Sequence, residues 1–177
     1  MNNKQTFTSA NTSINANKLP SAFIKVSPYG AVLDYGCGKY TEHIKNYVMQ
    51  EKGDKFKTFC YFPYDKFNQS EHTNKQAIAY GKTFGYNTVY INNVLNVIDN
   101  ENVIWNILYE CFDMCNIGGK IVIQIYEGNK SGIGKETKND CFQRNEKTKD
   151  YERFFGAFQG RPFTYKRTGN IIIVIKH

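Results

Sequence analysis

The chain has 177 residues and a formal net charge of +7 at pH 7, and its mean hydropathy is -0.56. This length suits a single domain with its own core, and no apolar run approaches the roughly 18 residues of a membrane-spanning helix. The N-terminus lacks the apolar stretch of a signal peptide, so we expect a cytoplasmic protein without membrane contact.

The predicted elements alternate between strands and helices. A polar segment over residues 1–17, which we expect to be ordered only in part, precedes a single domain over residues 18–177. Short apolar runs predict strands, and apolar residues at helical spacing predict helices. In chain order we expect a strand at 31–34, a helix at 42–51, a strand at 57–62 ended by Pro63, a helix at 70–84, a strand at 88–92, a helix at 103–115, a strand at 118–128, a helix at 147–158 and two strands within 163–177.

This order of elements predicts the fold class. Strands that alternate with helices form a parallel sheet through right-handed crossovers, so we expect a Rossmann-like α/β fold, a three-layer sandwich. The last two strands are joined by a tight turn at Gly169-Asn170 and therefore form an antiparallel hairpin. A dinucleotide-binding Rossmann domain would continue with parallel strands, so this hairpin indicates a different ligand.

A glycine loop follows the first predicted strand, in "VLDYGCGKY", residues 32–40. Gly36, Cys37 and Gly38 match the start of a dinucleotide fingerprint, but Thr41 stands where that fingerprint has its third small residue. Asp34, just before the loop, would repel a pyrophosphate and attract an ammonium group. A ligand with an amino-acid end therefore fits this loop better than a dinucleotide does.

A second acid, Asp65, follows the second predicted strand, where a carboxylate can accept hydrogen bonds from both hydroxyl groups of a ribose. The glycine loop, this acid and the terminal hairpin together indicate S-adenosylmethionine as the cofactor. The loop after the strand at 88–92 should lie at the same edge of the sheet, beside the methyl group. The predicted cofactor-binding residues are Asp34, Gly36, Cys37, Gly38, Asp65, Asn92 and Asn93.

These motifs resemble the class I S-adenosylmethionine-dependent methyltransferases, whose first motif is matched by "VLDYGCGK" and whose sheet ends in an antiparallel strand. The chain looks most similar to small phage and bacterial methyltransferases, including those found beside DNA phosphorothioation systems. The segments similar to that group are "TSINANKLPSAF", "NNVLNVI" and "GKETKNDCFQRN". The resemblance implies an S-adenosylmethionine-dependent methyltransferase but does not identify the methyl acceptor.

The chain departs from that family in one predicted element. Residues 66–87, between Asp65 and the strand at 88–92, are too few for a helix, a strand and a second helix with their loops. We therefore expect the third, edge strand of the sheet to be missing. Because that strand normally supplies a side chain to the adenine, we expect Phe84 or Tyr86 to take its place.

The predicted catalytic residues are Asn93 and Glu127. Asn93 can orient an amide or hydroxyl group of the substrate, or it can simply cap the following turn. Glu127 ends a strand near the same edge and can act as a general base, or it can be a solvated charge. The loop after Asn92 lacks both the Asp/Asn-Pro-Pro-aromatic motif and a Pro-Cys nucleophile, which disfavours the DNA methyltransferases that use them.

The remaining candidates would contact the methyl acceptor. Residues 131–145 predict a long polar loop over the sheet edge, a common place for substrate walls. We expect substrate contacts from Tyr126, Lys135, Gln143 and Arg144, with plain surface exposure as the alternative for the last three. The net charge of +7 slightly favours nucleic acid as a partner.

Two other functions stay open. A protein that binds S-adenosylmethionine without transferring its methyl group, as a phage-type sequestering or anti-defence factor, would need the same cofactor pocket. A lyase or hydrolase that cleaves the cofactor has no distinguishing feature in the sequence. The five cysteines form no C-x-x-C pair and the three histidines are scattered, so we expect neither disulfides nor a metal site. The sequence does not indicate an oligomeric state.

Overall fold

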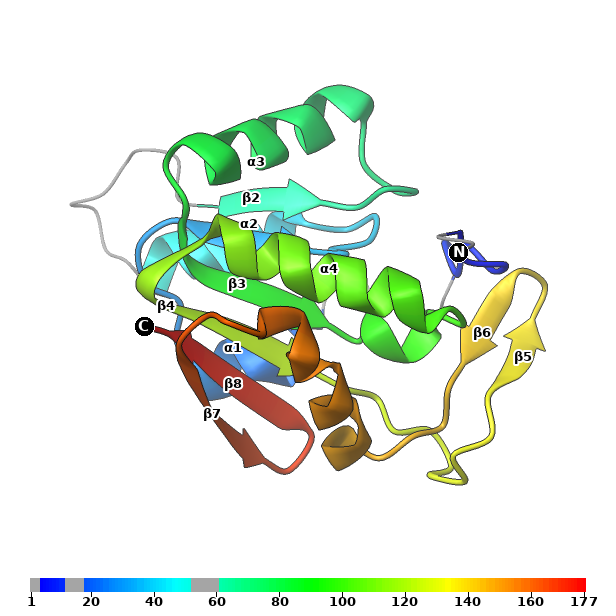
Figure 1. Cartoon of the computed structure of the whole chain (residues 1–177). Helices are drawn as coiled ribbons and strands as arrows, with labels where there is room; N and C mark the ends of the chain where they lie inside the picture. The colour runs from blue at the N-terminus through cyan, green and yellow to red at the C-terminus, as the bar shows by residue number, and fades with distance from the viewer. Residues whose placement is uncertain (1–3, 12–17, 52–60) are drawn as a thin grey trace.

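A six-stranded mixed sheet forms the centre of the molecule, in a computed structural model that describes residues 4–11, 18–51 and 61–177 (Figure 1). The strand order is β2-β1-β3-β4-β8-β7, and β5 and β6 form a separate two-stranded sheet. The strands are β1 Val32–Tyr35, β2 Tyr61–Tyr64, β3 Tyr86–Asn92, β4 Cys115–Gln124, β5 Lys135–Lys138, β6 Cys141–Gln143, β7 Phe163–Thr168 and β8 Ile171–Lys176.

Helices cover both faces of this sheet. The α-helices are α1 Ser21–Lys25, α2 Glu42–Glu51, α3 Glu71–Thr83 and α4 Glu101–Met114, and the 3₁₀ helices are η1 Leu95–Val97 and η2 Thr148–Phe158. The helix α1 is an element that the sequence patterns did not predict. None of the helices among the described residues has both the length and the apolar character needed to cross a membrane.

The side chains of the buried strands point alternately to the two faces of the sheet, and this divides the core into two halves. In β1, Val32 packs in the cluster with α1 and α2, while its neighbour Leu33 packs in the cluster with α3, α4 and η2. Successive side chains of a strand point to opposite faces, so a continuous apolar run requires a cover on both sides. The short runs in the sequence therefore predicted a three-layer arrangement, which the structure confirms.

The C-terminal hairpin is antiparallel, as predicted. Strand β8 pairs with β4 on one side and with β7 on the other, both in antiparallel register. Gly169 has φ +57°, a left-handed conformation that the tight turn before β8 requires.

The edge strand predicted to be missing is absent among the described residues 61–92. The chain passes from β2 through α3 directly into β3, and β2 lies at the edge of the sheet (Figure 1). Pro63 was predicted to end the second strand but lies inside β2, which an edge strand tolerates because one side needs no backbone donors. Residues 57–60 of that predicted strand lie outside the described residues.

Residues 131–145 were predicted as one long polar loop, and this prediction is wrong. They contain the β5–β6 hairpin, which pairs Lys135 with Gln143 and Glu136 with Phe142. The N-terminal segment docks beside it: Thr8 N–H donates to Asp140 Oδ1 at 2.9 Å, and the rings of Phe7 and Phe142 stack at 5.4 Å. The segment and the hairpin both lie beyond the carboxyl ends of the parallel strands (Figure 1).

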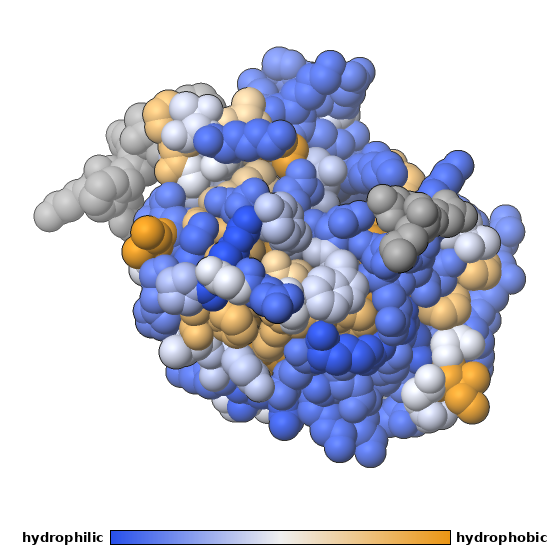
Figure 2. All heavy atoms as spheres, viewed as in Figure 1, coloured by the Kyte–Doolittle hydropathy of each residue, from blue (hydrophilic) through white to orange (hydrophobic). Residues whose placement is uncertain are grey.

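The surface on the side drawn in Figure 2 is mostly hydrophilic. Apolar atoms show in a band across the middle of this face and in smaller patches near its edges. This polar character agrees with the mean hydropathy of -0.56.

Candidate functional site

Two cavities lie at the carboxyl ends of the parallel strands. The first has a volume of about 610 Å³ and the second about 910 Å³. Gly36, Asn93 and Val97 line both of them, so the glycine loop and the loop after β3 form their common wall. A crevice at this edge of an open α/β sheet is where such folds bind ligands.

The glycine loop is held against the end of β2. The N–H groups of Gly36 and Cys37 both donate to the carbonyl oxygen of Tyr64, at 2.7 and 3.1 Å. Gly36 has φ +75°, and a Cβ at this position would lie 2.3 Å from Cγ2 of Val94. The loop after β3 therefore packs directly on the glycine, which leaves no space for a side chain.

Asp65 lines the first cavity and joins the end of β2 to the glycine loop. Its Oδ1 accepts hydrogen bonds from the backbone N–H groups of Phe67 and Asn68, at 2.9 and 2.8 Å. Its Oδ2 accepts one from Gly38 N–H at 3.0 Å and has no second donor among the described residues. A carboxylate oxygen can accept two, so Oδ2 keeps capacity for a hydroxyl group of a ligand.

The other walls of the first cavity come from elements that the sequence analysis did not assign to the site. They include the apolar residues Val94, Val97, Ile98, Val103 and Ile107, and the N-terminal residues Gln5, Thr8, Ser9 and Ala10. The apolar residues after β3 recur at helical spacing in "NNVLNVI", and this spacing could have predicted a short helix that forms a wall of the site. The polar N-terminal residues carry no comparable signal.

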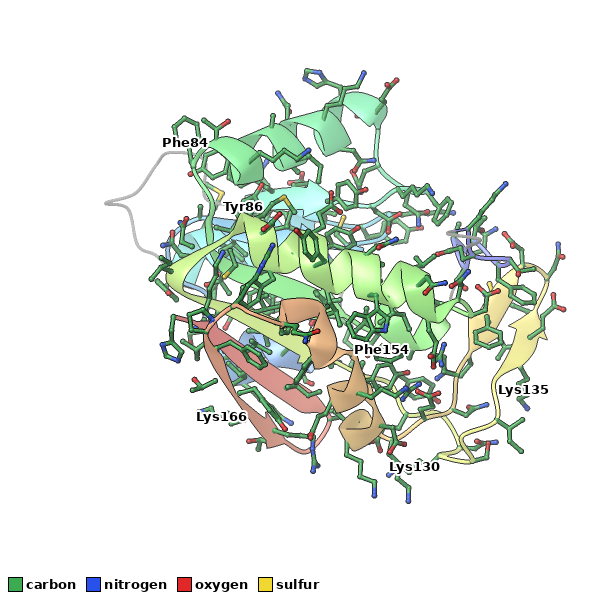
Figure 3. All side chains as sticks on the ribbon, in the orientation of Figure 1. Phe84, Tyr86, Lys130, Lys135, Phe154 and Lys166 are labelled. Carbon is green, nitrogen blue, oxygen red and sulfur yellow. The ribbon has the colours of Figure 1, made fainter. Side chains whose placement is uncertain are left out.

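Phe84 and Tyr86 do not contact the cavity, so the prediction that they hold the adenine is wrong. Both lie at the α3–β3 junction, at the opposite end of β3 (Figure 3). Tyr86 is fully buried and its hydroxyl donates to Ala77 O at 2.6 Å, while Phe84 is 68% exposed. The apolar walls that the segment after β3 and α4 contribute to the first cavity are the alternative contact surface for an adenine.

Asp34 lines the second cavity and is a buried carboxyl group. Only 1% of the residue is exposed, and Tyr61 donates its hydroxyl hydrogen to Oδ2 at 2.8 Å. Burial raises the pKa of this carboxyl to about 7, although the Tyr61 hydroxyl and the adjacent Asn92 amide act in the opposite direction. The nearby Cys37 thiol also has a pKa raised by burial, so it stays protonated.

Asn92 and Asn93 lie where the sequence predicts, at the end of β3. The side-chain nitrogen and oxygen of Asn92 are buried and have no hydrogen-bond partner of ordinary geometry among the described residues. Asn93 has φ +55°, and its N–H donates to Gln124 O at 2.8 Å. The cofactor-binding residues predicted from the sequence are thus brought together around the common wall of the two cavities.

Polar side chains from α1, β4 and β6 complete the second cavity. Gln124 Oε1 accepts hydrogen bonds from the Ser21 hydroxyl and the Ala22 N–H, at 3.0 and 2.7 Å. Gln143 and Tyr126, both predicted to contact the substrate, line this cavity, with 7% and 61% of the residue exposed. Lys18 also lies on the lining. These residues supply the polar groups of the second cavity.

Glu127 lies outside both cavities, and its geometry does not support the predicted role as a general base. Its Oε1 accepts two hydrogen bonds from Thr148, one from N–H and one from the hydroxyl, both at 2.7 Å. These hydrogen bonds, the backbone one first, lower the pKa of the carboxyl to about 2. The side chain instead holds the start of η2, because the first N–H groups of a helix lack internal partners.

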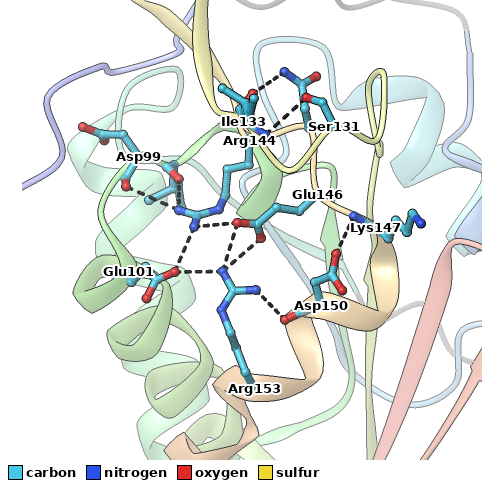
Figure 4. A network of polar contacts seen from close by, with 11 residues as sticks. Asp99, Glu101, Ser131, Ile133, Arg144, Glu146, Lys147, Asp150 and Arg153 are labelled. Atoms are coloured by element: carbon cyan, nitrogen blue, oxygen red, sulfur yellow. Dashed lines mark hydrogen bonds and ion pairs between the residues drawn. The ribbon is translucent and has the colours of Figure 1, made fainter.

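Arg144 and Lys135 also lie away from the cavities, so the structure does not support their predicted contacts with substrate. The Arg144 guanidinium is buried and bonds to Glu101 and Glu146, each at 3.0 Å (Figure 4). Arg153 bonds to the same two carboxylates. Lys135 extends from β5 on the exposed side of the hairpin (Figure 3). Arg144 therefore belongs to an internal ion-pair network and is not free to bind phosphate.

Comparison with solved structures identifies methyltransferases of similar fold. One is a 1,6-didemethyltoxoflavin-N1-methyltransferase from Burkholderia thailandensis with S-adenosylhomocysteine bound, with a TM-score of 0.57 and 12% identity over 87% of this chain and 72% of that one. A second is KedS8, a sugar N-methyltransferase from Streptoalloteichus sp ATCC 53650, with a TM-score of 0.54 and 9% identity over 94% and 97%. A third is CalS10, an amino pentose methyltransferase from Micromonospora echinaspora with S-adenosylmethionine bound, with a TM-score of 0.50 and 10% identity over 89% and 87%.

These likenesses establish the fold class and no more. No protein-family model and no curated protein matches the chain. The Burkholderia enzyme and CalS10 were solved with S-adenosylhomocysteine and S-adenosylmethionine bound. This chain shares their Rossmann-like α/β fold.

Proposed function

We propose that this chain is an S-adenosylmethionine-dependent methyltransferase whose cofactor extends across the common wall of the two cavities. The observation that carries the proposal is the hydrogen bond from Gly38 N–H to Asp65 Oδ2, at 3.0 Å. It holds the glycine loop next to a carboxylate suited to binding ribose, at the same edge of the sheet. Solved neighbours with this fold bind S-adenosylmethionine or S-adenosylhomocysteine.

Each part of the cofactor has a matching region. The ribose hydroxyl groups would bond to Asp65 Oδ2, and the adenine would pack on the apolar walls of the first cavity. The amino-acid end would pass the glycine loop into the second cavity, where the Asp34 carboxylate attracts the ammonium group. The buried Asn92 amide, which also acts on the Asp34 carboxyl, lies beside it.

Transfer of the methyl group needs the acceptor, the methyl carbon and the sulfur in line. The second cavity extends beyond Asn93 toward Tyr126 and Gln143, which leaves space for an acceptor next to the cofactor. KedS8 is a sugar N-methyltransferase and CalS10 is an amino pentose methyltransferase, so this fold can accommodate small polar acceptors. The association with phage or phosphorothioation systems stays a prediction of the sequence resemblance.

The Asp65→Ala variant tests the cofactor site. Loss of a charge-assisted hydrogen bond to ribose should weaken S-adenosylmethionine binding by about 1.5–3 kcal/mol, measured by calorimetry. Asp113→Ala is the matched control, because Asp113 pairs only with Arg161 among the described residues and lies outside both cavities. Since Asp65 also holds the local loop, thermal unfolding must show that the variant is folded. Equal affinity of the folded variant and the wild type would remove Asp65 from the site.

Turnover distinguishes methyl transfer from the two alternative functions. The wild-type protein is incubated with S-adenosylmethionine carrying a labelled methyl group and with fractionated cell extract, and mass spectrometry follows the cofactor. We expect S-adenosylhomocysteine and a labelled acceptor. Intact, bound S-adenosylmethionine with no labelled acceptor would favour a sequestering protein, and cleavage without an acceptor would favour a lyase or hydrolase.

A further inference from the structure

Asn96 is a buried residue on the wall of the second cavity, and its side-chain amide has no role in the cofactor binding proposed above. It lies on η1, is only 1% exposed, and directly precedes Val97, which lines both cavities. Its backbone carbonyl accepts a hydrogen bond from Arg144 N–H at 2.8 Å, so the β6 end of the hairpin fixes its position.

The orientation of the Asn96 amide follows from its neighbours. Gln143 donates through Nε2 to the backbone carbonyl of Tyr126 at 3.0 Å, which leaves Oε1 as the free end of that amide. Asn96 Nδ2 donates to this Oε1 at 3.1 Å. The backbone carbonyl can only accept, so this chain of two amides fixes Asn96 with its oxygen as the remaining polar atom.

Asn96 Oδ1 has no hydrogen-bond partner among the described residues. An unpaired buried acceptor costs free energy, and native proteins rarely keep one without a water or a ligand to satisfy it. The residue lines the second cavity and its oxygen is buried just behind the surface, so a molecule in that cavity is the nearest source of a donor once the wall shifts slightly to admit it. The fixed oxygen selects a ligand with an N–H or O–H group and rejects one that presents only acceptors.

The rim of the second cavity indicates what kind of molecule carries this donor. Tyr40 and Tyr126 line it with 50% and 61% of their surfaces exposed, so their rings are available for stacking on a planar group. Lys18 and Lys138 are exposed lining residues that can attract phosphate. A planar heterocycle with an amino group and an attached phosphate satisfies all three features.

We propose that the second cavity takes the base of a nucleotide as methyl acceptor, with the amino group of the base donating a hydrogen bond to Asn96 Oδ1. This proposal rests on the proposed methyltransferase function. The amine nitrogen attacks the methyl carbon, the carbon–sulfur bond breaks, and sulfur keeps the electron pair, which yields S-adenosylhomocysteine. The nitrogen then releases its proton to water. Asn96 would stabilise the positive charge that develops on nitrogen, and Gln143 is a positioning residue.

The test uses protein saturated with S-adenosylhomocysteine and three pairs of nucleoside monophosphates, measured by calorimetry. Each pair compares a base with the analogue that lacks its exocyclic amine: AMP with purine riboside monophosphate, CMP with zebularine monophosphate and GMP with IMP. We expect at least one amine-bearing nucleotide to bind about tenfold more tightly than its analogue, the effect of one hydrogen bond to a buried acceptor.

Variants assign that preference to the amide pair. Asn96→Ala should remove the discrimination within the pair, and Gln143→Leu should reduce it because Asn96 is then free to rotate. Both should keep S-adenosylhomocysteine affinity within about twofold of the wild type. Asn102→Ala is the control, since Asn102 is an exposed residue of α4 outside both cavities, and it should keep the full preference.

The outcomes separate this inference from the proposed function. Normal S-adenosylhomocysteine binding with no discrimination in any of the three pairs, or with discrimination that survives Asn96→Ala, would overturn the nucleotide inference alone. Failure of the wild type to bind S-adenosylhomocysteine would overturn the methyltransferase proposal itself. Binding of single-stranded oligonucleotides more tightly than of the monophosphates, with strong salt dependence, would identify the polymer as the source of the base.

Discussion

Two carboxyl groups near the edge of the sheet show how surroundings decide the role of a residue. Asp34 is buried and its pKa is raised to about 7, whereas Glu127 accepts two hydrogen bonds from Thr148 and its pKa is lowered to about 2. Asp34 can therefore change its charge near neutral pH, while Glu127 stays ionised. The residue that the sequence suggested as a base is the one less able to take up a proton.

Asp34 should make the stability of the unliganded protein fall as pH rises. Its folded pKa of about 7 lies above its ordinary value of 3.8, so between these values the folded state keeps a proton that the unfolded chain has lost. The free energy of unfolding should decrease by roughly 1.4 kcal/mol per pH unit across this window and level off above it. Urea unfolding between pH 5 and pH 8 measures the effect.

Asp34→Asn should flatten this dependence, because the amide does not titrate. Asp113→Asn, at an exposed position that pairs with Arg161, should retain it. Identical pH profiles for Asp34→Asn and the wild type would show that another group causes the change. Saturating S-adenosylmethionine should release a proton near pH 6.5 if its ammonium group lies beside Asp34.

Glu127→Gln should lower stability without lowering turnover. The neutral amide accepts the two Thr148 hydrogen bonds less strongly, and the loss of a group that caps a helix start costs about 1 kcal/mol. Because the folded pKa is depressed, this stabilisation is present above pH 4.5 and is lost as pH falls toward 2. Thermal unfolding at pH 7 and a methyl-transfer assay below the unfolding transition check both halves. A large rate loss at unchanged stability would restore Glu127 as a base.

At the scale of elements, the site depends on three loops that pack on one another. The glycine loop bonds to the end of β2, the loop after β3 packs on Gly36, and the N-terminal segment completes the first cavity. A change in any one loop should therefore alter the cofactor pocket, even where the changed atom does not contact the cofactor.

Gly36→Ala should weaken S-adenosylmethionine binding by at least tenfold. The new Cβ would lie 2.3 Å from Val94 Cγ2, so one of the two loops must move. Gly118→Ala is a matched control, because Gly118 has φ +76° and a Cβ there meets nothing within 4 Å. Both variants should lose about 1–2 kcal/mol from the left-handed backbone conformation, but only the first should lose affinity. Equal affinities in the two variants would mean that this packing does not shape the pocket.

At the scale of the whole molecule, a partly buried ion-pair network ties the β6 end of the hairpin to the helical layer. Arg144 and Glu146 follow β6, Glu101 begins α4, and Arg153 belongs to η2 (Figure 4). The Arg144 guanidinium also donates to the backbone carbonyl of Ile98 at 3.1 Å. This network positions the segment that carries Gln143, so it contributes to the second cavity indirectly.

Arg144→Ala should lower the free energy of unfolding by about 1–3 kcal/mol, because it removes a buried guanidinium that bonds to Glu146, to Glu101 and to the Ile98 carbonyl, while Arg153 still pairs with both carboxylates. Lys135→Ala, on the exposed strand β5, should change it by less than about 0.5 kcal/mol. Chemical unfolding of both variants measures the difference. Equal stability of the two variants would argue against the network.

The sequence by itself determined the order of the strands of the main sheet and of the helices between them, the C-terminal antiparallel hairpin, the absence of the edge strand from the described residues 61–92 and the residues that meet at the common wall of the cavities. These features follow from local periodicity, from turn residues such as Gly169 and from chain length, all of which act over short stretches. The prediction of Asp34, Gly36 and Asp65 as neighbours needed only the rule that parallel strands end at one edge.

Only the tertiary structure decided the surroundings of Glu127, Arg144, Tyr86 and Asn96. Whether a carboxylate is a base or a helix cap depends on Thr148, which is distant in sequence, and whether an arginine binds phosphate depends on the carboxylates already beside it. The sequence did not identify Asn96 as a candidate site residue. An asparagine indicates a binding site only when its neighbours fix one end of the amide and leave the other end unpaired. Such pairings arise between distant segments, and local sequence patterns do not record them.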